Sequence, residues 1–397
     1  MINLAARDIA HGVGRYVATG FGLGLLIGVT LTMTGVYRGM VDDAQVLLRA
    51  TGADVWVVQQ HTLGPFAEPS SLHDDAYRSI RALPGVVDTG NVAYLTMQVS
   101  HGGRPVRVMI AGYEPGRPGE PGYLTAGRPI TRSHYEAIAD EQTEFAIGDR
   151  VRIRRNDYTV VGLTRRMVTF GGDPMLFIPL KDAQEVQFLK DNDAIRNERD
   201  RLAANPSVNR PGVPGLLETV QDLQTSNRSV NAVLVRVAPG WDPQVVAENV
   251  KRWKHLQAFS AADMQELLVG TVISRAAKQI GLFLLILAFV SGAIVAFIVY
   301  TMTMAKLKEI AVLKLIGTRN RTIAGMILQE ALGLGVIGFV VGKIAATLWG
   351  PVFPRYVLLL NEDTARAFVI TLVVCVVASV IGIRAALRVD PGEAIGG

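Results

Sequence analysis

The side chains that most often do chemistry are sparse and scattered in this chain. None of the histidines forms an HExxH motif or another spacing typical of metal ligands. The one cysteine, Cys375, lies in an apolar stretch, so no disulfide can form within the chain. The sequence therefore predicts neither a metal site nor a catalytic constellation. The histidines are His11, His61, His73, His101, His134 and His255.

A glycine-rich run in the last third of the chain imitates a phosphate-binding loop. Gly338 and Gly342 precede Lys343, but the position that needs the first glycine holds Ile337. Ile344 follows the lysine where the motif requires Ser or Thr, and the run lies inside an apolar stretch. We therefore expect no nucleotide site in this chain.

The most informative pattern is the run 306–321, called the elbow below. It predicts a short amphipathic helix that ends at a glycine. Such a helix can lay its apolar side chains in a groove of a soluble partner, with charged residues orienting it. A helix that merely lies in the lipid interface is the simpler alternative. The residues expected to make the partner contact are Glu309, Ile310, Leu313, Lys314, Ile316, Gly317 and Arg319.

Four apolar stretches must position the elbow. Each has the roughly 20 residues that a helix needs to cross the hydrocarbon core. A cleaved signal peptide is the alternative for the first, but that stretch is long and lacks a clear cleavage site. Buried core helices are the alternative for the others, although three such runs would not share one small core. The stretches are expected to cross the membrane at 17–37, 278–305, 322–349 and 366–387.

Orientation follows from the Lys and Arg residues in the short flanks of these stretches. Basic residues gather in the elbow and near both termini, whereas the loop 350–365 carries Arg355 together with Glu362 and Asp363. The elbow and both termini are therefore expected in the cytoplasm of a bacterial cell. The protein would be a multi-pass protein of the inner membrane, with residues 38–277 outside.

The expected fold class is an integral membrane α-helical protein with four transmembrane helices and a large extracytoplasmic α+β domain between the first two. Strands are expected at 53–58, 106–111 and 233–237, and the second of these is expected to have one solvent-exposed face. Helices are expected at 73–83 and 243–256. A hairpin over 148–162 is expected to turn at Asn156-Asp157. The full division is a cytoplasmic amphipathic segment 1–16, helix 17–37, outer domain 38–277 with a polar insert at about 189–229, helix 278–305, elbow 306–321, helix 322–349, outer loop 350–365, helix 366–387 and cytoplasmic tail 388–397.

Two charged residues fall inside the third expected membrane helix. A central charge costs roughly 2.5–3.5 kcal/mol on the insertion scale, so Glu330 and Lys343 should face protein or water. They lie about 20 Å apart along one helix and cannot pair with each other. Glu330, near the cytoplasmic end, is a candidate for a coupling contact. Snorkelling to the headgroups is the alternative for both residues.

Small residues recur every fourth position on two of the expected membrane helices. Such faces let helices approach closely, either within one chain or between two copies. Ordinary glycine content of membrane helices is the alternative interpretation. The glycines concerned are Gly20, Gly24 and Gly28 on the first helix and Gly338 and Gly342 on the third.

The composition agrees with a membrane protein. Hydrophobic residues make up 49% of the 397 residues, and the formal net charge is only +5. Much of that excess lies in the elbow and the terminal flanks. Because no basic face is interleaved with aromatic residues, the sequence does not favour nucleic-acid binding.

The elbow resembles the signature of the FtsX-like permease family, also called MacB-type or type VII ABC proteins. The one departure in the elbow is Ala311, where the family often has glycine. The head of the chain is most similar to the DevC and HrtB branch, in the segments 4–8, 52–56 and 111–115. The family motifs have counterparts in 309–318, in Leu328-Gln329-Glu330-Ala331, in Asp390-Pro391-Gly392-Glu393-Ala394 and in the hairpin 147–162.

The resemblance implies a permease subunit that works as a homodimer with two copies of a separate ABC ATPase docked at the elbow. ATP hydrolysis in the partner would move the helices and, through them, the outer domains. The exported substrate would be hydrophobic or amphipathic, such as a lipid, glycolipid or haem, with a periplasmic adaptor as an optional partner alongside membrane lipids. The alternatives are an FtsX-like regulator that activates a cell-wall hydrolase, and a membrane receptor without an ATPase. The elbow argues against the receptor.

Overall fold

The structure is a computed structural model that describes residues 13–169, 171–188, 200–206, 215, 217 and 228–388. The chain divides into two compact units, each with its own core. The helical unit comprises Met1–Met40 and Ser274–Gly397, and the sheet unit comprises Val41–Ile273. Three expected segments lie mostly outside the described residues, namely the N-terminal segment, the polar insert and the C-terminal tail.

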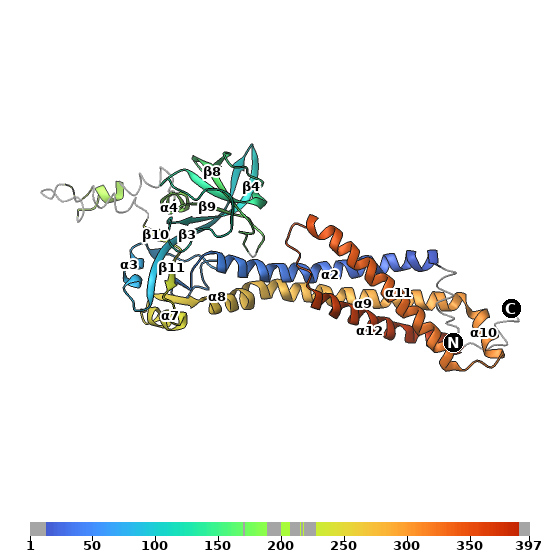
Figure 1. Ribbon diagram of the computed structural model, residues 1–397. Helices are drawn as coiled ribbons and strands as arrows, with labels where there is room; N and C mark the ends of the chain where they lie inside the picture. The colour runs from blue at the N-terminus through green and yellow to red at the C-terminus, as the bar shows by residue number, and fades with distance from the viewer. Residues whose placement is uncertain are drawn as a thin grey trace. The chain divides into compact units, whose positions relative to one another are not determined.

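Four long helices form the helical unit, and all four are long and apolar enough to cross a membrane. Figure 1 shows their described parts running alongside one another. The charge-free runs found in the sequence account for the greater part of each. The helices are α2 (Val13–Ala50), α9 (Ser274–Ala305), α11 (Asn320–Trp349) and α12 (Asn361–Arg388), joined by the short helix α10 (Leu307–Leu315) and the 3₁₀ turn η3 (Gly350–Val352).

Helix α2 is longer than expected, because it continues to Ala50 instead of ending at residue 37. Beyond Arg38 the sequence keeps a helical spacing of buried apolar residues, with Met40, Ala44 and Leu47 among them. After Gly39, no glycine or proline occurs before Gly52, which has a φ of +60°. The last part of this helix therefore belongs to the sheet unit.

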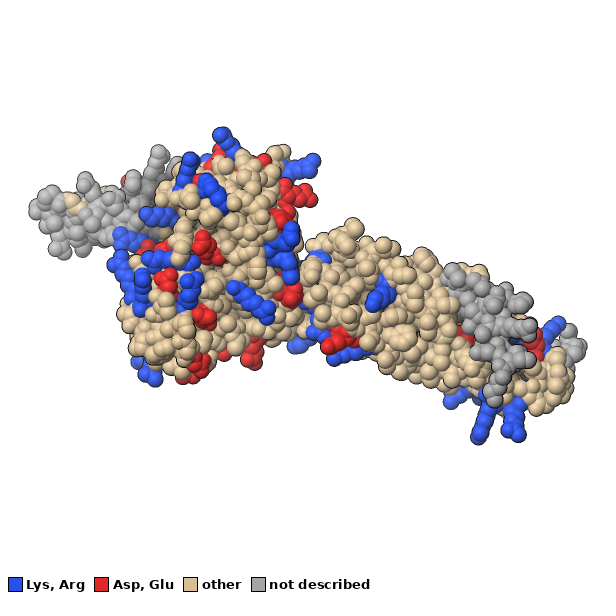
Figure 2. Space-filling model, in the orientation of Figure 1, with Lys and Arg blue, Asp and Glu red and all other residues tan. Residues whose placement is uncertain are grey.

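The outward faces of α9 and α12 are almost wholly apolar. Large side chains such as Phe289, Phe297 and Val377 are exposed there. Figure 2 shows few charged residues over the helical unit on the face drawn, and many over the sheet unit. A surface of this kind is stable in lipid or against another apolar surface, and it would be costly in water.

The sheet unit is built on a mixed sheet that has ten strands among the described residues. The strand order is β12-β1-β11-β3-β4-β9-β6-β8-β5, with β7 beside β3 and β8, and β10 and β2 form a separate pair. Among the strands that the structure describes, only the pairs β4–β9 and β6–β8 are parallel. The strands are β1 (Val55–Gln59), β2 (Leu72–His73), β3 (Val86–His101), β4 (Arg104–Tyr113), β5 (Leu124–Gly127), β6 (Glu136–Asp140), β7 (Arg150–Ile153), β8 (Asn156–Thr164), β9 (Met175–Pro179), β10 (Ser229–Val230), β11 (Ala232–Val237) and β12 (Leu256–Ser260).

Short helices cover this sheet. Helix α7 packs on β12 and β1, whereas α3 and α4 pack on β3 and its neighbours. Helix α7 begins with an N-cap, since the Asp242 carboxylate accepts a hydrogen bond from the Gln244 amide at 2.9 Å. The helices are α3 (Ala76–Arg81), α4 (Leu180–Phe188), α7 (Pro243–Lys251), α8 (Ala261–Leu267), the 3₁₀ turn η1 (Glu141–Thr143) and the π-helical η2 (Leu268–Ile273).

The expected strands at 53–58 and 233–237 are confirmed as β1 and β11. Two other expectations were wrong. Strand β4 was expected to have one solvent-exposed face, but it is exposed only at its start. From Val108 onward it lies between β3 and β9 and is buried on both faces. Helix α7 ends at Lys251 rather than near residue 256, since Leu256 already begins β12.

The expected hairpin exists, but its turn lies two residues earlier than expected. Ile153 pairs with Asn156, so Arg154 and Arg155 form the turn, and Arg154 takes a φ of +52°. This register places Arg152 opposite Asp157, which joins unlike charges across the two strands. Turn propensity at Asn156-Asp157 was therefore outweighed by strand pairing.

Candidate functional site

The elbow has a short helix at its centre, as the sequence predicts. Helix α10 spans Leu307–Leu315 and follows α9 after a single break at Lys306. It ends because Gly317 takes a φ of +88°, where its amide donates to the Lys314 carbonyl at 3.0 Å. Figure 1 shows α10 between the end of α9 and the start of α11.

One face of α10 is built into the core of the helical unit. Ile310 is only 1% exposed and belongs to the same apolar cluster as Ile323 and Ile327 of α11. The sequence analysis assigned Ile310 to the partner contact, whereas in the structure its side chain packs within its own chain. Leu313 is partly buried and Ile316 is exposed.

A buried ion pair fixes the start of the elbow to α11. The ammonium Nζ of Lys306 donates to Oε1 of Glu330 at 2.8 Å, and their side chains are 7% and 6% exposed. Glu330, which was expected to face protein or water, thus contacts the lysine at the start of the elbow. Removing either partner would leave the other charge buried without this salt bridge, which is costly.

The end of the elbow is tied to α12. Lys314 donates from Nζ to the carbonyl oxygen of Leu387 at 3.0 Å, at the C-terminal end of that helix. A cation is favourable there because the last carbonyls of a helix are unpaired and carry partial negative charge. The elbow is therefore held by one charged contact to α11 and another to α12.

The opposite face of α10 carries an exposed apolar stripe, which we call the docking stripe. Val312, Leu315 and Ile316 are 46%, 64% and 76% exposed, and their spacing of three and four places them on one face of a helix. Glu309 and Arg319, which the sequence analysis chose as orienting charges, are also exposed. The elbow is thus apolar on two faces, one closed by its own chain and one open.

The glycine faces lie against each other within one chain. A methyl group added at Gly24 would lie 2.6 Å from Cγ1 of Val341, and one added at Gly342 would lie 2.6 Å from the carbonyl oxygen of Gly24. Gly20, Gly28 and Gly338 are similarly close to the facing helix. The residue numbers rise together along α2 and α11, so the two helices run in the same direction, as expected of the first and third spans.

The outer charged residues of the helical unit have separate environments. The Arg38 guanidinium of α2 donates two hydrogen bonds to the Asp363 carboxylate of α12, at 2.7 and 2.9 Å. Lys343 is exposed on α11, beside an apolar groove that includes Phe339 and Leu348. Arg38 and Asp363 were not singled out from the sequence, although both end apolar stretches and carry opposite charges.

The architecture of a four-helix unit with a sheet unit between its first two helices has clear relatives. Residues 17–253 match the family model of the MacB-like periplasmic core domain, and residues 281–391 match that of the FtsX-like permease C-terminal domain. The chain belongs to the ABC transporter permeases of the MacB/FtsX type.

This permease is similar over its whole length to two bacterial proteins. It is 25% identical to one uncharacterized ABC transporter permease of Mycobacterium tuberculosis (strain H37Rv), and 23% identical to another from the same strain, with 100% of each chain covered in both cases. The periplasmic region of MacB from Actinobacillus actinomycetemcomitans aligns with a TM-score of 0.36 at 11% identity, covering 55% of this chain and 95% of that one. The narrower DevC and HrtB resemblance stays a prediction.

Sequence analysis of the permease missed two parts of this site. It did not pair Lys306 with Glu330, which are 24 residues apart with the whole of α10 between them. It also placed the apolar anchors about one position out of phase, because a nine-residue helix with apolar residues on two faces gives no clear preference for either face. The exposed Val312 and Leu315 complete the stripe with Ile316.

Proposed function

We propose that this permease is the membrane subunit of an export system in the bacterial inner membrane. It works as a homodimer with two copies of a separate ABC ATPase, and each ATPase docks on the docking stripe. ATP and Mg²⁺ are bound by the ATPase, and both termini and the elbow are cytoplasmic. The sheet unit lies outside the cytoplasm, where an adaptor protein is a further candidate partner.

The observation that carries this proposal is the two-faced character of α10. Its docking stripe is open, and an amphipathic helix of this kind fits a groove on a soluble protein. Its other face is locked to α11 by Lys306 and Glu330 and to α12 by Lys314. A force applied by the ATPase to the stripe would therefore reach two membrane helices directly, which is the mechanotransmission that we propose.

The helical unit also contains features suited to an apolar or amphipathic substrate. A cavity of about 290 Å³ lies between α2, α9 and α12, and apolar side chains such as Leu23, Leu284 and Ile370 dominate its lining. Asp363 and Arg366 supply its charged residues. Sites that take small molecules are mostly apolar with few polar groups, and an amphipathic compound has the matching chemistry.

The test of docking is the variant Ile316→Asp. It places a carboxylate in the proposed groove, which should weaken docking by on the order of 3 kcal/mol, or about a hundredfold in affinity. Since Ile316 is 76% exposed, folding should be unaffected. The measurement is co-purification of the ATPase and its stimulation by the permease. The matched control is Val245→Asp, the same change at an exposed residue of α7.

The outcome of that test is decisive in both directions. We expect Ile316→Asp to lose the ATPase and Val245→Asp to keep it. If Ile316→Asp retains both the partner and the activity, the elbow is an interfacial helix only and the coupling proposal is wrong.

Orientation has its own test, which uses the burial of the single cysteine. Cys375 is buried, so it should not react with a maleimide that cannot cross the membrane. We expect Lys254→Cys, in the sheet unit, to be labelled in intact spheroplasts, and Lys308→Cys, in α10, only after permeabilisation. Labelling of Lys308→Cys in intact spheroplasts would reverse the proposed topology.

A further inference from the structure

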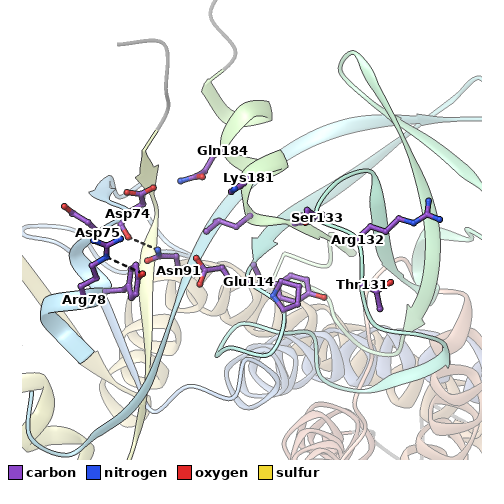
Figure 3. Close-up of a pocket in the computed structure, with 15 residues that line it drawn as sticks. Asp74, Asp75, Arg78, Asn91, Glu114, Thr131, Arg132, Ser133, Lys181 and Gln184 are labelled. Atoms are coloured by element: carbon purple, nitrogen blue, oxygen red, sulfur yellow. Dashed lines mark hydrogen bonds between the residues drawn. The ribbon is translucent and has the colours of Figure 1, made fainter. Parts of the chain in front are cut away.

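The sheet unit contains a second cavity that the transport scheme does not use. It has a volume of about 390 Å³ and lies between the ends of several strands and helix α4. Figure 3 shows its polar lining, with Asp74, Asn91 and Glu114 gathered near one another and Lys181 and Gln184 approaching from α4. Its volume is close to the lower end of the range for small-molecule sites, so it would suit a small ligand.

One part of this cavity is rich in hydrogen-bond acceptors, although Arg78, which donates to the Tyr77 hydroxyl at 3.4 Å, also lines it. The Oδ1 atom of Asn91 is buried and makes no hydrogen bond among the described residues, while its Nδ2 donates to the Asp74 carbonyl at 2.8 Å. A buried amide oxygen without a donor is costly, and such exceptions in folded proteins call for an explanation. A ligand that brings a donor to this point would remove the cost.

Two carboxylates stand beside that oxygen. Glu114 is partly buried, and burial raises the pKa of its carboxyl even though Arg117 and Asn91 act to lower it. The Nε atom of Arg117 lies 3.2 Å from Oε2 of Glu114, so this carboxylate already has one cationic neighbour. The carboxylate of Asp74 has His73 at 3.7 Å as its only ion-pair neighbour among the described residues. An ammonium group, with three donors, matches these three acceptors.

A cation also lines the cavity, on helix α4. Lys181 is exposed at the start of α4 and makes no ion pair within the described part of the chain. Ser133 lies on the same side and offers a hydroxyl, as Figure 3 shows. Arg132 is less suited, because its side chain extends away from the acceptors and lies 3.6 Å from Glu136. An anionic group is therefore favoured beside Lys181.

From this arrangement we propose that the cavity binds a small zwitterion of amino-acid or dipeptide size. Its ammonium group is held by Asp74, Asn91 and Glu114, and its carboxylate is held by Lys181. Charge complementarity at both ends gives the site its selectivity, because a ligand with one end capped leaves the facing charged residue without a partner. The site is independent of ATPase docking, so it can stand if the coupling proposal fails.

The test uses the full-length permease in lipid nanodiscs and isothermal titration with three matched probes. These are L-alanyl-L-alanine, its C-terminal amide, which is a cation, and its N-acetyl derivative, which is an anion. We expect the zwitterion to bind, and each capped probe to bind about tenfold more weakly or worse, since a hydrogen bond to a charged group is lost. No saturable binding of the zwitterion at about 1 mM would overturn the proposal.

Two variants test which residues hold the carboxylate end and the ammonium end of the ligand. In Lys181→Gln the free dipeptide and its amide should bind alike, because the residue that distinguishes them is gone. In Glu114→Gln the preference for the free amine over the acetylated probe should fall about tenfold. The control Lys254→Gln, at an exposed lysine elsewhere in the sheet unit, should bind as the unaltered protein does. Thermal unfolding of each variant reports whether it is folded.

The results that would contradict this assignment are equally specific. Equal affinity for all three probes would show that charge at the ends is not recognised. A folded Lys181→Gln variant that still prefers the free carboxylate, or a folded Glu114→Gln variant that keeps its full preference for the free amine, would place the ligand elsewhere.

Discussion

The ion pair between Lys306 and Glu330 offers the sharpest test of how the elbow is anchored. Changing Lys306→Met keeps the length and apolar stem of the side chain but removes its ammonium group. Glu330 then stays buried without its salt bridge to Lys306. At 2.8 Å the attraction between unit charges is about 6 kcal/mol for an effective dielectric constant of 20, and part of this offsets the cost of taking both groups out of water.

The net cost of breaking such a pair from one side is about 3–5 kcal/mol. For a unit of this size that corresponds to a fall in the unfolding midpoint of roughly 10 °C. The double variant Lys306→Met with Glu330→Leu removes both charges and should recover most of the loss, because apolar replacements of a buried pair are often neutral. The control is Lys308→Met, which alters an exposed lysine on the same short helix.

The assay is thermal unfolding of the purified permease in detergent, followed by the fluorescence of its tryptophans or by circular dichroism. Lys306→Met should unfold well below the unaltered protein, and Lys308→Met should not. Two results would refute the reasoning. One is a Lys306→Met variant as stable as the Lys308→Met control, and the other is a double variant no more stable than the single one.

Two further predictions concern the packing of the membrane helices and the acid stability of the sheet unit. Gly24→Leu should lower the unfolding midpoint, since overpacking costs about 1–3 kcal/mol. The control Gly22→Leu should not lower it, because nothing lies within 4 Å of a methyl group added at Gly22. Equal midpoints for the two variants would mean that α2 and α11 separate freely. The hydrogen bond from Arg128 and those from the backbone amides of Thr131 and Arg132 lower the pKa of Glu136 from 4.5 to about 2, with Arg128 the largest cause. Glu136 therefore stabilises the fold above pH 4.5 and loses this effect as the pH falls towards 2. Arg128→Gln should move acid unfolding, followed by circular dichroism, to higher pH, and an unchanged midpoint would contradict the assignment.

Much of the fold could be predicted from the sequence because membrane helices depend on local composition. Long charge-free runs have few stable alternatives, so the four spans were located to within a few residues, apart from the extension of α2. The sheet was harder, because its order depends on pairings far apart in the chain. Strand β3 shows this, since its first half pairs with β11 and its second half with β4.

The candidate site could be located but not resolved from the sequence. The position of the elbow follows from its place between two spans, yet the phase of a short helix depends on what packs against it. Residues 310 and 316 are both isoleucines, and only the packing of neighbouring helices makes Ile310 buried and Ile316 exposed. The cavity of the sheet unit left no signal at all, because Asp74, Asn91, Glu114 and Lys181 come together only through the topology of the sheet.

The central claim is that the docking stripe is the surface that receives the ATPase. A photoreactive phenylalanine analogue replacing Ile316 tests it most directly, in cells that express both subunits. The account predicts a crosslinked product that contains the ATPase from this position, and none from the same analogue replacing Phe289, an exposed apolar residue of α9. Absence of the product at Ile316, or equal yield at Phe289, would contradict it.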